Sequence, residues 1–350
     1  MNHNSDKSTP LGISKLIQRR ISSAVLKTLH ASNTVSEPNG KRNGEPNDEA
    51  NDALATLSTL STSLTEQQPH AIDVSSLTSL PAVFISHGAP TLATEQSATT
   101  HALARMGQNL PKPVAIIIMS AHWQSPKLEI NNNPSPATWH DFSGFDRSLY
   151  QINYPAKGAQ ALAETLSDEL AGVLAEYGDV FASDSDEQKD KTHANTKVST
   201  NPLRPFDHGV WVPLLHLYPQ ADVPVVQLSL PTHFDSHACY KLGAMLSGLR
   251  HLQILLIGSG SITHNLNHLR WQADTEDKLA KDFKVWLLRQ LKTDIASALD
   301  WQTFTDYQQV HPSDEHLLPL FFSFCAGQRV SVVHESMIHH SLGMDIYRFD

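Results

Sequence analysis

Three histidines occupy positions where α/β proteins usually bind their ligands. His87 follows the apolar run Ala-Val-Phe-Ile-Ser, His122 follows Ala-Ile-Ile-Ile-Met-Ser-Ala, and His264 follows Ile-Leu-Leu-Ile-Gly-Ser-Gly-Ser-Ile-Thr. Open α/β sheets bind ligands beyond the carboxyl ends of their strands. Neutral imidazoles from separate strand ends can hold one metal ion and leave coordination positions open for a substrate. Each histidine alone is typical of a hydrogen-bonded structural residue, but their recurrence at one point of the pattern predicts a shared metal site.

Two further histidines lie in loops that run into predicted helices. His208 directly follows Asp207, and a carboxylate neighbour could fix its tautomer and make it a general base. The alternative is that Asp207 only caps the helix that follows. His316 follows Asp314 and Glu315, acidic residues that also suit a helix N-terminus. A structural role for His316 is therefore as well supported as a catalytic one.

The elements that must position these side chains follow from hydrophobic patterning after residue 79. Apolar runs typical of buried strands recur at Pro81–Ile85, Val114–Met119, Val223–Leu230, Leu252–Ile257 and Val330–Val333. Helical patterns lie between them at Thr94–Met106, Lys157–Leu174, His237–Leu249, Asp277–Leu291 and His316–Cys325. Fully apolar strands that alternate with helices predict an α/β fold: a single domain, residues 80–350, with a central mixed, largely parallel sheet flanked by helices.

Composition excludes several classes of function. The chain has 350 residues and a formal net charge of −10, which argues against a basic face for nucleic acid. Its two cysteines cannot build a disulfide framework or a Cys-x-x-Cys metal site. No apolar run approaches the roughly 20 residues needed to span a bilayer, and no signal peptide is evident. These features predict a cytoplasmic protein without stable membrane insertion.

Two polar tracts stand apart from the predicted domain. Residues 1–79 contain no Phe, Trp or Tyr and predict a low-complexity, mostly disordered extension. Within it, Leu11–Leu29 could form a basic amphipathic helix for a membrane surface or a partner, although a frayed helix without a specific role is the more economical interpretation. Ser183–Asn201 is expected to be a surface insertion.

Six motifs, taken in order, resemble the class III extradiol ring-cleavage dioxygenases, in particular their 4,5-DOPA extradiol dioxygenase branch. They are Ile-Ser-His-Gly-Ala-Pro, Val-Ala-Ile-Ile-Ile-Met-Ser-Ala-His-Trp, Trp-His-Asp-Phe-Ser-Gly-Phe, Pro-Phe-Asp-His-Gly-Val-Trp, Thr-His-Asn-Leu and His-Pro-Ser-Asp-Glu-His-Leu-Leu-Pro-Leu. The resemblance covers about Leu80 to Tyr347, nearly the whole predicted domain.

The resemblance implies roles for five histidines. His87, His122 and His264 match the metal-binding positions, and His208 matches the acid/base histidine. His316 falls in a motif beside the metal, as a further ligand or a substrate contact. One divalent ion per chain is implied, Fe(II) for catalysis, although an all-histidine site would also bind Zn(II) readily.

The implied reaction inserts O₂ into the ring of a small, DOPA-like catechol to give a ring-opened semialdehyde. Trp123, Phe142 and Trp211 are candidates for the wall of the substrate pocket, whereas His339 and His340 are expected to be structural. Two other functions stay open on the same scaffold: a zinc-dependent hydrolase, and a non-enzymatic binding protein like the Memo-type relatives of these dioxygenases. The oligomeric state is not indicated by the sequence.

Overall fold

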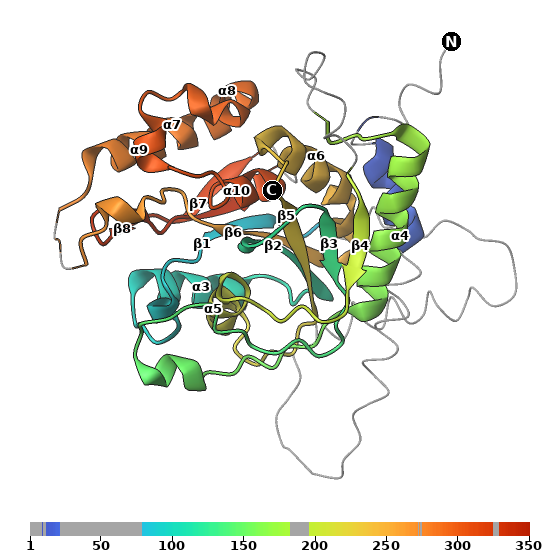
Figure 1. Ribbon diagram of the computed structural model, residues 1–350, viewed down its shortest axis with the longest axis horizontal. Coiled ribbons are helices and arrows are strands. Elements are labelled where there is room, and N and C mark those ends of the chain that lie inside the picture. The colour runs from blue at the N-terminus through green and yellow to red at the C-terminus, as the bar shows by residue number, and fades with distance from the viewer. Residues whose placement is uncertain are drawn as a thin grey trace, which may run out of the picture.

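The computed structural model describes residue 9 and residues 12–21, 79–182, 196–271, 273, 275–324 and 329–350. Eight strands form one sheet in the order β4-β3-β5-β2-β6-β1-β10-β7. The four central strands β5, β2, β6 and β1 are parallel. Strand β3 is antiparallel to β5 and parallel to β4, whereas β10 is antiparallel to both β1 and β7. The predicted α/β fold with a mixed, largely parallel sheet is therefore confirmed (Figure 1).

The sheet strands are β1 (Ala82–Ser86), β2 (Ala115–Ser125), β3 (Leu128–Asn131), β4 (Val198–Asn201), β5 (Val225–Pro231), β6 (Ile254–Gly260), β7 (Val330–His334) and β10 (Ile346–Phe349). A separate hairpin consists of β8 (Met337–Ile338) and β9 (Leu342–Gly343). The helices are α3 (Ala98–Asn109), α4 (Gln160–Tyr177), α5 (His208–Leu217), α6 (Ser236–Leu246), α7 (Lys278–Thr293), α8 (Ile295–Leu299), α9 (Tyr307–Val310) and α10 (Leu318–Phe324).

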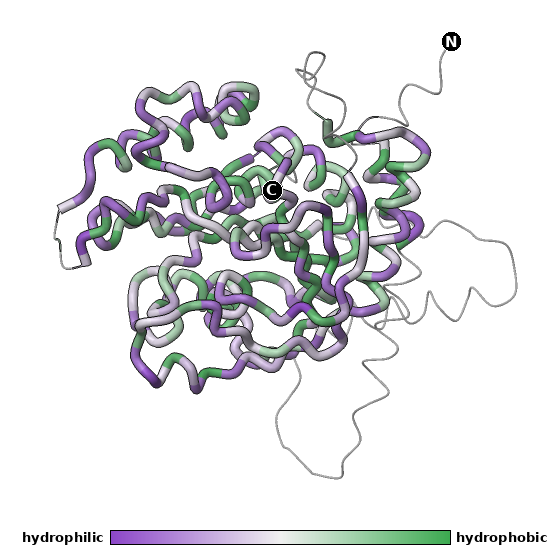
Figure 2. Tube along the Cα trace, in the orientation of Figure 1, coloured by the Kyte–Doolittle hydropathy of each residue, from purple (hydrophilic) through white to green (hydrophobic). Residues whose placement is uncertain are grey.

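Two hydrophobic cores lie on opposite faces of the sheet. Helices α4, α6, α7 and α10 pack on one face, and α3 and α5 cover the other. Alternate residues of each strand enter the two cores; in β1, for example, Phe84 belongs to the first and Ile85 to the second. Figure 2 shows the apolar strands at the centre of the molecule. Burial on both faces explains why these strands read as continuous apolar runs.

Residues 12–21 form a helix that packs against the domain, although they fall in the predicted extension. Ile13, Ile17 and Ile21 are almost completely buried in the core formed with α4 and α6. The Gly248 N–H donates to Ser14 Oγ (2.8 Å), and Arg20 pairs with Glu169 of α4. The apolar face of this helix thus contacts the chain's own domain. The rest of residues 1–78, apart from Thr9, lies outside the described residues.

The second polar tract contains a strand that sequence patterning did not indicate. Residues 183–195 lie outside the described residues, but Val198–Asn201 form the edge strand β4, which pairs with Leu128–Asn131 of β3. The side chains of β4 are only partly buried, so its sequence lacks the apolar run of a central strand.

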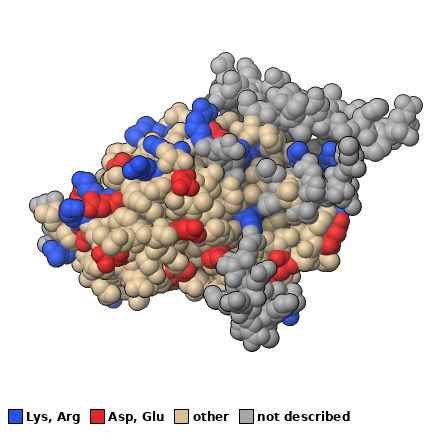
Figure 3. Space-filling view, turned by 90° about the horizontal axis from the view of Figure 1, so that it is seen from above, with Lys and Arg blue, Asp and Glu red and all other residues tan. Residues whose placement is uncertain are grey.

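Charge on the described surface is mixed. Figure 3 shows Lys and Arg side chains interspersed with Asp and Glu side chains over the face seen from above. In the described part of the chain, no helix combines the length and apolar character that a membrane span requires.

Candidate metal centre

The histidines predicted to form the site gather at the carboxyl-terminal edge of the parallel strands. His87 directly follows β1. His122 lies within β2, where the pairing with β5 shifts between Met119 and Gln124. Such an irregularity re-aims side chains out of the regular ladder. His122 is therefore presented by a distorted strand, although the sequence had placed it just beyond a regular one.

Two glycines let the remaining elements approach this edge. Gly209, in the first turn of α5, lies so close to β2 that a Cβ atom would overlap Ser120 Oγ and press against the His122 ring. At the end of β6, a Cβ on Gly260 would overlap the carbonyl oxygen of His316. The Ser261 N–H donates to that same carbonyl at 2.7 Å. These contacts fix His208 and His316 beside the strand ends.

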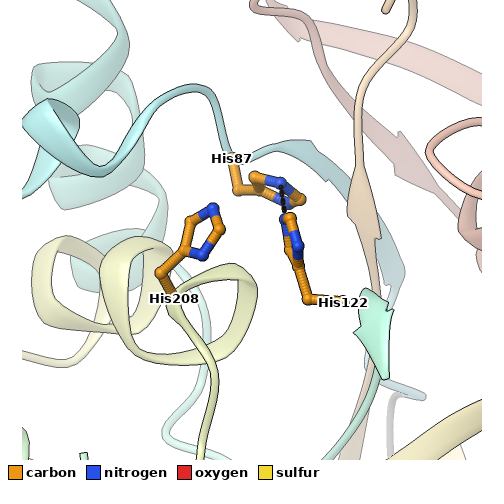
Figure 4. A group of neighbouring side chains, drawn as sticks. All are labelled: His87, His122 and His208. Atoms are coloured by element: carbon orange, nitrogen blue, oxygen red, sulfur yellow. Dashed lines mark hydrogen bonds between the residues drawn. The ribbon is translucent and has the colours of Figure 1, made fainter. Parts of the chain in front are cut away.

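Four imidazole rings, the histidine cluster, surround one point: His87, His122, His208 and His316. The Nε2 atoms of His87 and His122 are 2.9 Å apart (Figure 4). The ring centroid of His122 lies 4.0 Å from that of His208 and 5.0 Å from that of His316. The His87 ring lies at 5.4 Å and 5.5 Å from the same two rings. One ion could therefore contact several of these rings.

Hydrogen bonds at the outer nitrogens determine which inner nitrogens carry lone pairs. Ser259 Oγ donates its proton to the Gly209 carbonyl at 2.5 Å, so it must accept from Nδ1 of His87 at 3.0 Å. Neutral imidazole has only one N–H, and Nε2 of His87 is therefore left as an acceptor. This is the tautomer that a metal-ligating histidine adopts, with its second nitrogen held by a hydrogen bond.

Two ionised carboxylates impose the same tautomer on two other rings. Nδ1 of His208 donates to Asp141 Oδ1 at 2.9 Å, and Nδ1 of His316 donates to Glu315 Oε1 at 2.9 Å. Burial alone would raise the pKa of Asp141, but the hydrogen bonds from His208 outweigh it and the pKa is lowered. Burial likewise opposes ionisation of Glu315, yet the His316 hydrogen bond holds its pKa at about 2. Both histidines keep Nε2 free to bind a metal or a proton.

Burial favours the neutral form of three rings in the cluster, His87, His122 and His316. It lowers the pKa of His87 well below the usual value, with repulsion from His122 as the next contribution. Burial and the neighbouring His208 lower the pKa of His122 to about 4. Burial also brings the pKa of His316 to about 3, against the opposing hydrogen bond with Glu315. Neutral imidazole is the form that binds metal ions.

His264, a metal ligand predicted from the sequence, lies beside His316. Its ring stacks on that of His316, with centroids 3.5 Å apart and an interplanar angle of 9°. His316, in contrast, makes ring contacts with both His87 and His122. A second group that could hold a metal is formed by His264, Glu315 and His316. His264 thus lies next to the histidine cluster, in ring contact with His316.

Sequence reasoning missed the partner of His208. Asp207 was the expected carboxylate, but its side chain accepts from Ser120, Arg204 and Gln227 and makes no side-chain cap on α5. Asp141, 67 residues earlier in the chain, holds the His208 ring instead. The only signal for this residue was its place in the motif Trp-His-Asp-Phe-Ser-Gly-Phe, where no role had been assigned to it.

A cavity of about 330 Å³ opens in front of the histidine cluster. Phe142, one of three aromatic residues expected in its wall, lines it. Trp123 and Trp211 are instead buried: Trp123 packs under Arg204, and Trp211 donates its indole N–H to the Trp139 carbonyl. His339, expected to be structural, does line the cavity.

Comparison with known proteins gives a family match over nearly the whole described domain. Residues 81–350 match the family model described as the catalytic LigB subunit of aromatic ring-opening dioxygenase. A curated protein named 4,5-DOPA dioxygenase extradiol from Beta vulgaris is 33% identical over 76% of this chain and 95% of its own length. The Escherichia coli K12 protein of the same name is 31% identical over 71% of this chain and 86% of its own length.

More distant relatives agree with this match. A dioxygenase named tasH from Hapsidospora irregularis is 28% identical over 68% of this chain and 71% of its own length. Among solved structures, that of an uncharacterized protein from Escherichia coli K12 superposes with a TM-score of 0.63 and 26% identity. It covers 77% of this chain and 100% of its own.

Proposed function

Because the chain belongs to the family of catalytic LigB subunits of aromatic ring-opening dioxygenases, we propose that it cleaves the ring of a catechol-type substrate with Fe(II) and O₂. The main structural support for this proposal is the close approach of the His87 and His122 rings. Their Nε2 atoms lie 2.9 Å apart, close to the roughly 3 Å between neighbouring ligands whose bonds to a metal are about 2.1 Å long. When bound, the iron supplies the Lewis-acid and redox chemistry that activates catechol and O₂.

We propose His87, His122 and His316 as the metal ligands. All three rings contact one another, and the outer nitrogens of His87 and His316 are tied to Ser259 and Glu315. His264, the other ligand that the sequence predicts, stacks its ring on that of His316 and is proposed as a further ligand of the same ion. It lines the cavity with a pKa lowered by burial, which suits a neutral ring that binds a metal.

His208 is proposed as the acid/base residue. Its Nδ1–H donates to Asp141, which leaves Nε2 able to accept a phenolic proton. The Asp141 carboxylate then stabilises the imidazolium that forms. The edge of the His208 ring also packs against Phe142 in the cavity wall, with ring centroids 5.8 Å apart, so this base borders the space that would hold an aromatic ring.

The substrate proposal rests on the chemistry of the cavity and on the relatives. The names of two curated relatives support a 3,4-dihydroxyphenyl compound as the substrate. Apolar wall residues exclude water from the ring, while the histidine cluster accepts protons from the two hydroxyl groups. We further propose a soluble, cytoplasmic location for this activity.

The first experiment is oxygen uptake after anaerobic reconstitution with Fe(II) or Zn(II), with catechol and its 4-substituted derivatives as substrates. Uptake with iron alone, matched by a new visible absorbance from the ring-opened product, is expected because Zn(II) has no redox chemistry. Hydrolysis of an ester or amide substrate with the zinc protein, without oxygen uptake by either form, would replace the proposal with a zinc hydrolase. Stoichiometric metal without either activity would leave a binding protein.

A further inference from the structure

Apolar side chains predominate at one end of the cavity. Beyond the histidine cluster, five apolar residues, here called the outer wall, line it beside the polar ring of His339: Phe142, Phe145, Leu266, Leu269 and Trp271. Phe142 and Phe145 pack edge to face, with ring centroids 5.5 Å apart. No Lys, Arg, Asp or Glu occurs among the described residues that line the cavity. The hydroxyl groups of a catechol and its ring substituent would therefore meet opposite environments.

Charged groups near the cluster are already engaged. Asp141 accepts from His208 and Glu315 accepts from His316. Arg204 donates to the His122 carbonyl and to Asp207, and its guanidinium lies between two tryptophan rings. All three groups are paired within the protein, and none of them is among the described residues that line the cavity.

A strained turn contacts Trp271, one residue of the outer wall. Trp271, with 55% of its surface exposed, contacts the His339 ring at a centroid distance of 4.4 Å, and His339 Nδ1 donates to the Trp271 carbonyl. His339 and His340 connect β8 to β9 with φ values of +50° and +75°. Two successive bulky residues in the left-handed region are strained, and such strain is concentrated at functional sites.

We propose that the outer wall selects catechols whose ring substituent is uncharged and apolar, in preference to amino-acid side chains such as that of DOPA. This inference rests on the proposed dioxygenase function and concerns only what the ring carries. A zwitterionic substituent would lose hydration against the outer wall without gaining a charged partner there. An alkyl substituent gains about fourfold in affinity for each buried CH₂ group.

A matched series of four catechols tests the proposal. 4-Propylcatechol, 3,4-dihydroxyphenylpropionate and DOPA share a three-carbon substituent and differ in charge, while dopamine carries the ammonium group alone. Dissociation constants come from displacement of 4-nitrocatechol, followed by its absorbance, on the Zn(II)-loaded full-length protein, where no turnover occurs. The iron enzyme then gives kcat/KM for the same compounds. We expect 4-propylcatechol to exceed DOPA at least tenfold in both measurements.

Adding a cation to the outer wall should redirect this preference. Leu266 is 62% exposed, so Leu266→Arg is expected to fold, and it should improve binding of dihydroxyphenylpropionate relative to 4-propylcatechol by about tenfold. Val285→Arg is the matched control, because Val285 of α7 is 60% exposed and does not line the cavity. It should leave the order of the four compounds unchanged. Trp271→Ala should reduce the advantage of 4-propylcatechol over DOPA.

The outcomes separate this inference from the proposed function. If DOPA binds and reacts as well as or better than 4-propylcatechol, the selectivity proposal is wrong and the dioxygenase assignment stands. An unchanged order in Leu266→Arg would also count against it, because the outer wall would then not contact the substituent. If the iron protein cleaves none of the catechols and the zinc protein binds none, both proposals fail.

Discussion

The two ends of the cavity, the histidine cluster and the outer wall, differ in how their side chains are held in place. In the histidine cluster, the outer nitrogens of His87, His208 and His316 are fixed by Ser259, Asp141 and Glu315. At the outer wall, Leu266 and Trp271 expose more than half of their surface and are held mainly by neighbouring loops. A rigid inner end suits chemistry that tolerates little displacement, whereas an exposed apolar wall can change without disturbing it. We therefore propose that reaction type and substrate choice depend on different residues.

Removing an inner ligand should have the largest effect. His122→Ala is expected to lose bound metal and to reduce ring cleavage by at least about 10³-fold, because it deletes one nitrogen of the closest pair in the cluster. Metal analysis of the purified protein together with oxygen uptake measures both. His237→Ala is the control, since His237 is exposed and pairs with Asp300 on the surface. A full equivalent of metal in His122→Ala would contradict the proposed ligand set.

The next largest effect is expected at the His208–Asp141 pair. His208→Ala should retain metal and lose turnover, and Asp141→Asn should lower kcat by about 10- to 100-fold, because the carboxylate fixes the His208 tautomer. Asp300→Asn, which alters a pair of the same length on the surface, should have no effect. Loss of metal in His208→Ala would instead make His208 a ligand, an arrangement that its proximity to His87 and His122 also permits.

The buried histidines should make the unfolding free energy of the protein depend on pH. The folded-state pKa of His122 is lowered to about 4 and that of His316 to about 3, both below the ordinary value of 6.5. At a pH between the lowered pKa of each ring and 6.5, the histidine is protonated in the unfolded chain but neutral in the folded chain. The unfolding free energy of the metal-free protein is therefore full above pH 6.5 and falls at lower pH, by roughly 1 kcal/mol per pH unit for each such ring.

Urea unfolding at pH 7, 6 and 5 measures this slope. A variant with His122 replaced by Gln should show a shallower slope, and His237→Gln, which alters an exposed ring, should match the wild type. Equal slopes in all three proteins would show that His122 titrates alike in the folded and unfolded chains.

The smallest effect is expected at the exposed edge of the outer wall. Leu266→Ala should change the unfolding free energy by less than about 0.5 kcal/mol and leave turnover of unsubstituted catechol within about twofold. Leu342→Ala provides the contrast, because Leu342 lines the same cavity but is 5% exposed; it should cost roughly 2 kcal/mol or more. Comparable losses of unfolding free energy in both variants would contradict the weak packing inferred for Leu266.

Local sequence was sufficient for the elements with strong periodicity. The apolar runs at 81–85 and 252–257 correspond closely to β1 and β6, and the pattern at 277–291 to α7. The edge strand β4 was not predicted because its partly exposed side chains lack a continuous apolar run, and its neighbour β3 was not predicted because polar residues alternate with apolar ones in its four-residue sequence. An amphipathic helix was predicted within residues 11–29, and a helix is found at residues 12–21, but its burial against the domain was not predicted, because the polar residues around it are also typical of an extended tail.

Sequence by itself determined which side chains could carry the chemistry: histidines that recur after apolar runs at the carboxyl edge of a parallel sheet. Strand periodicity and strand order in an α/β fold make that placement a local matter. Only the tertiary structure decided how they divide the work. It joined Asp141 to His208 across 67 residues, stacked His264 on His316, and set an apolar wall before the cluster. Such pairings depend on the paths of the loops and on how closely distant backbone segments approach one another. The spacing of residues along the chain does not reveal either.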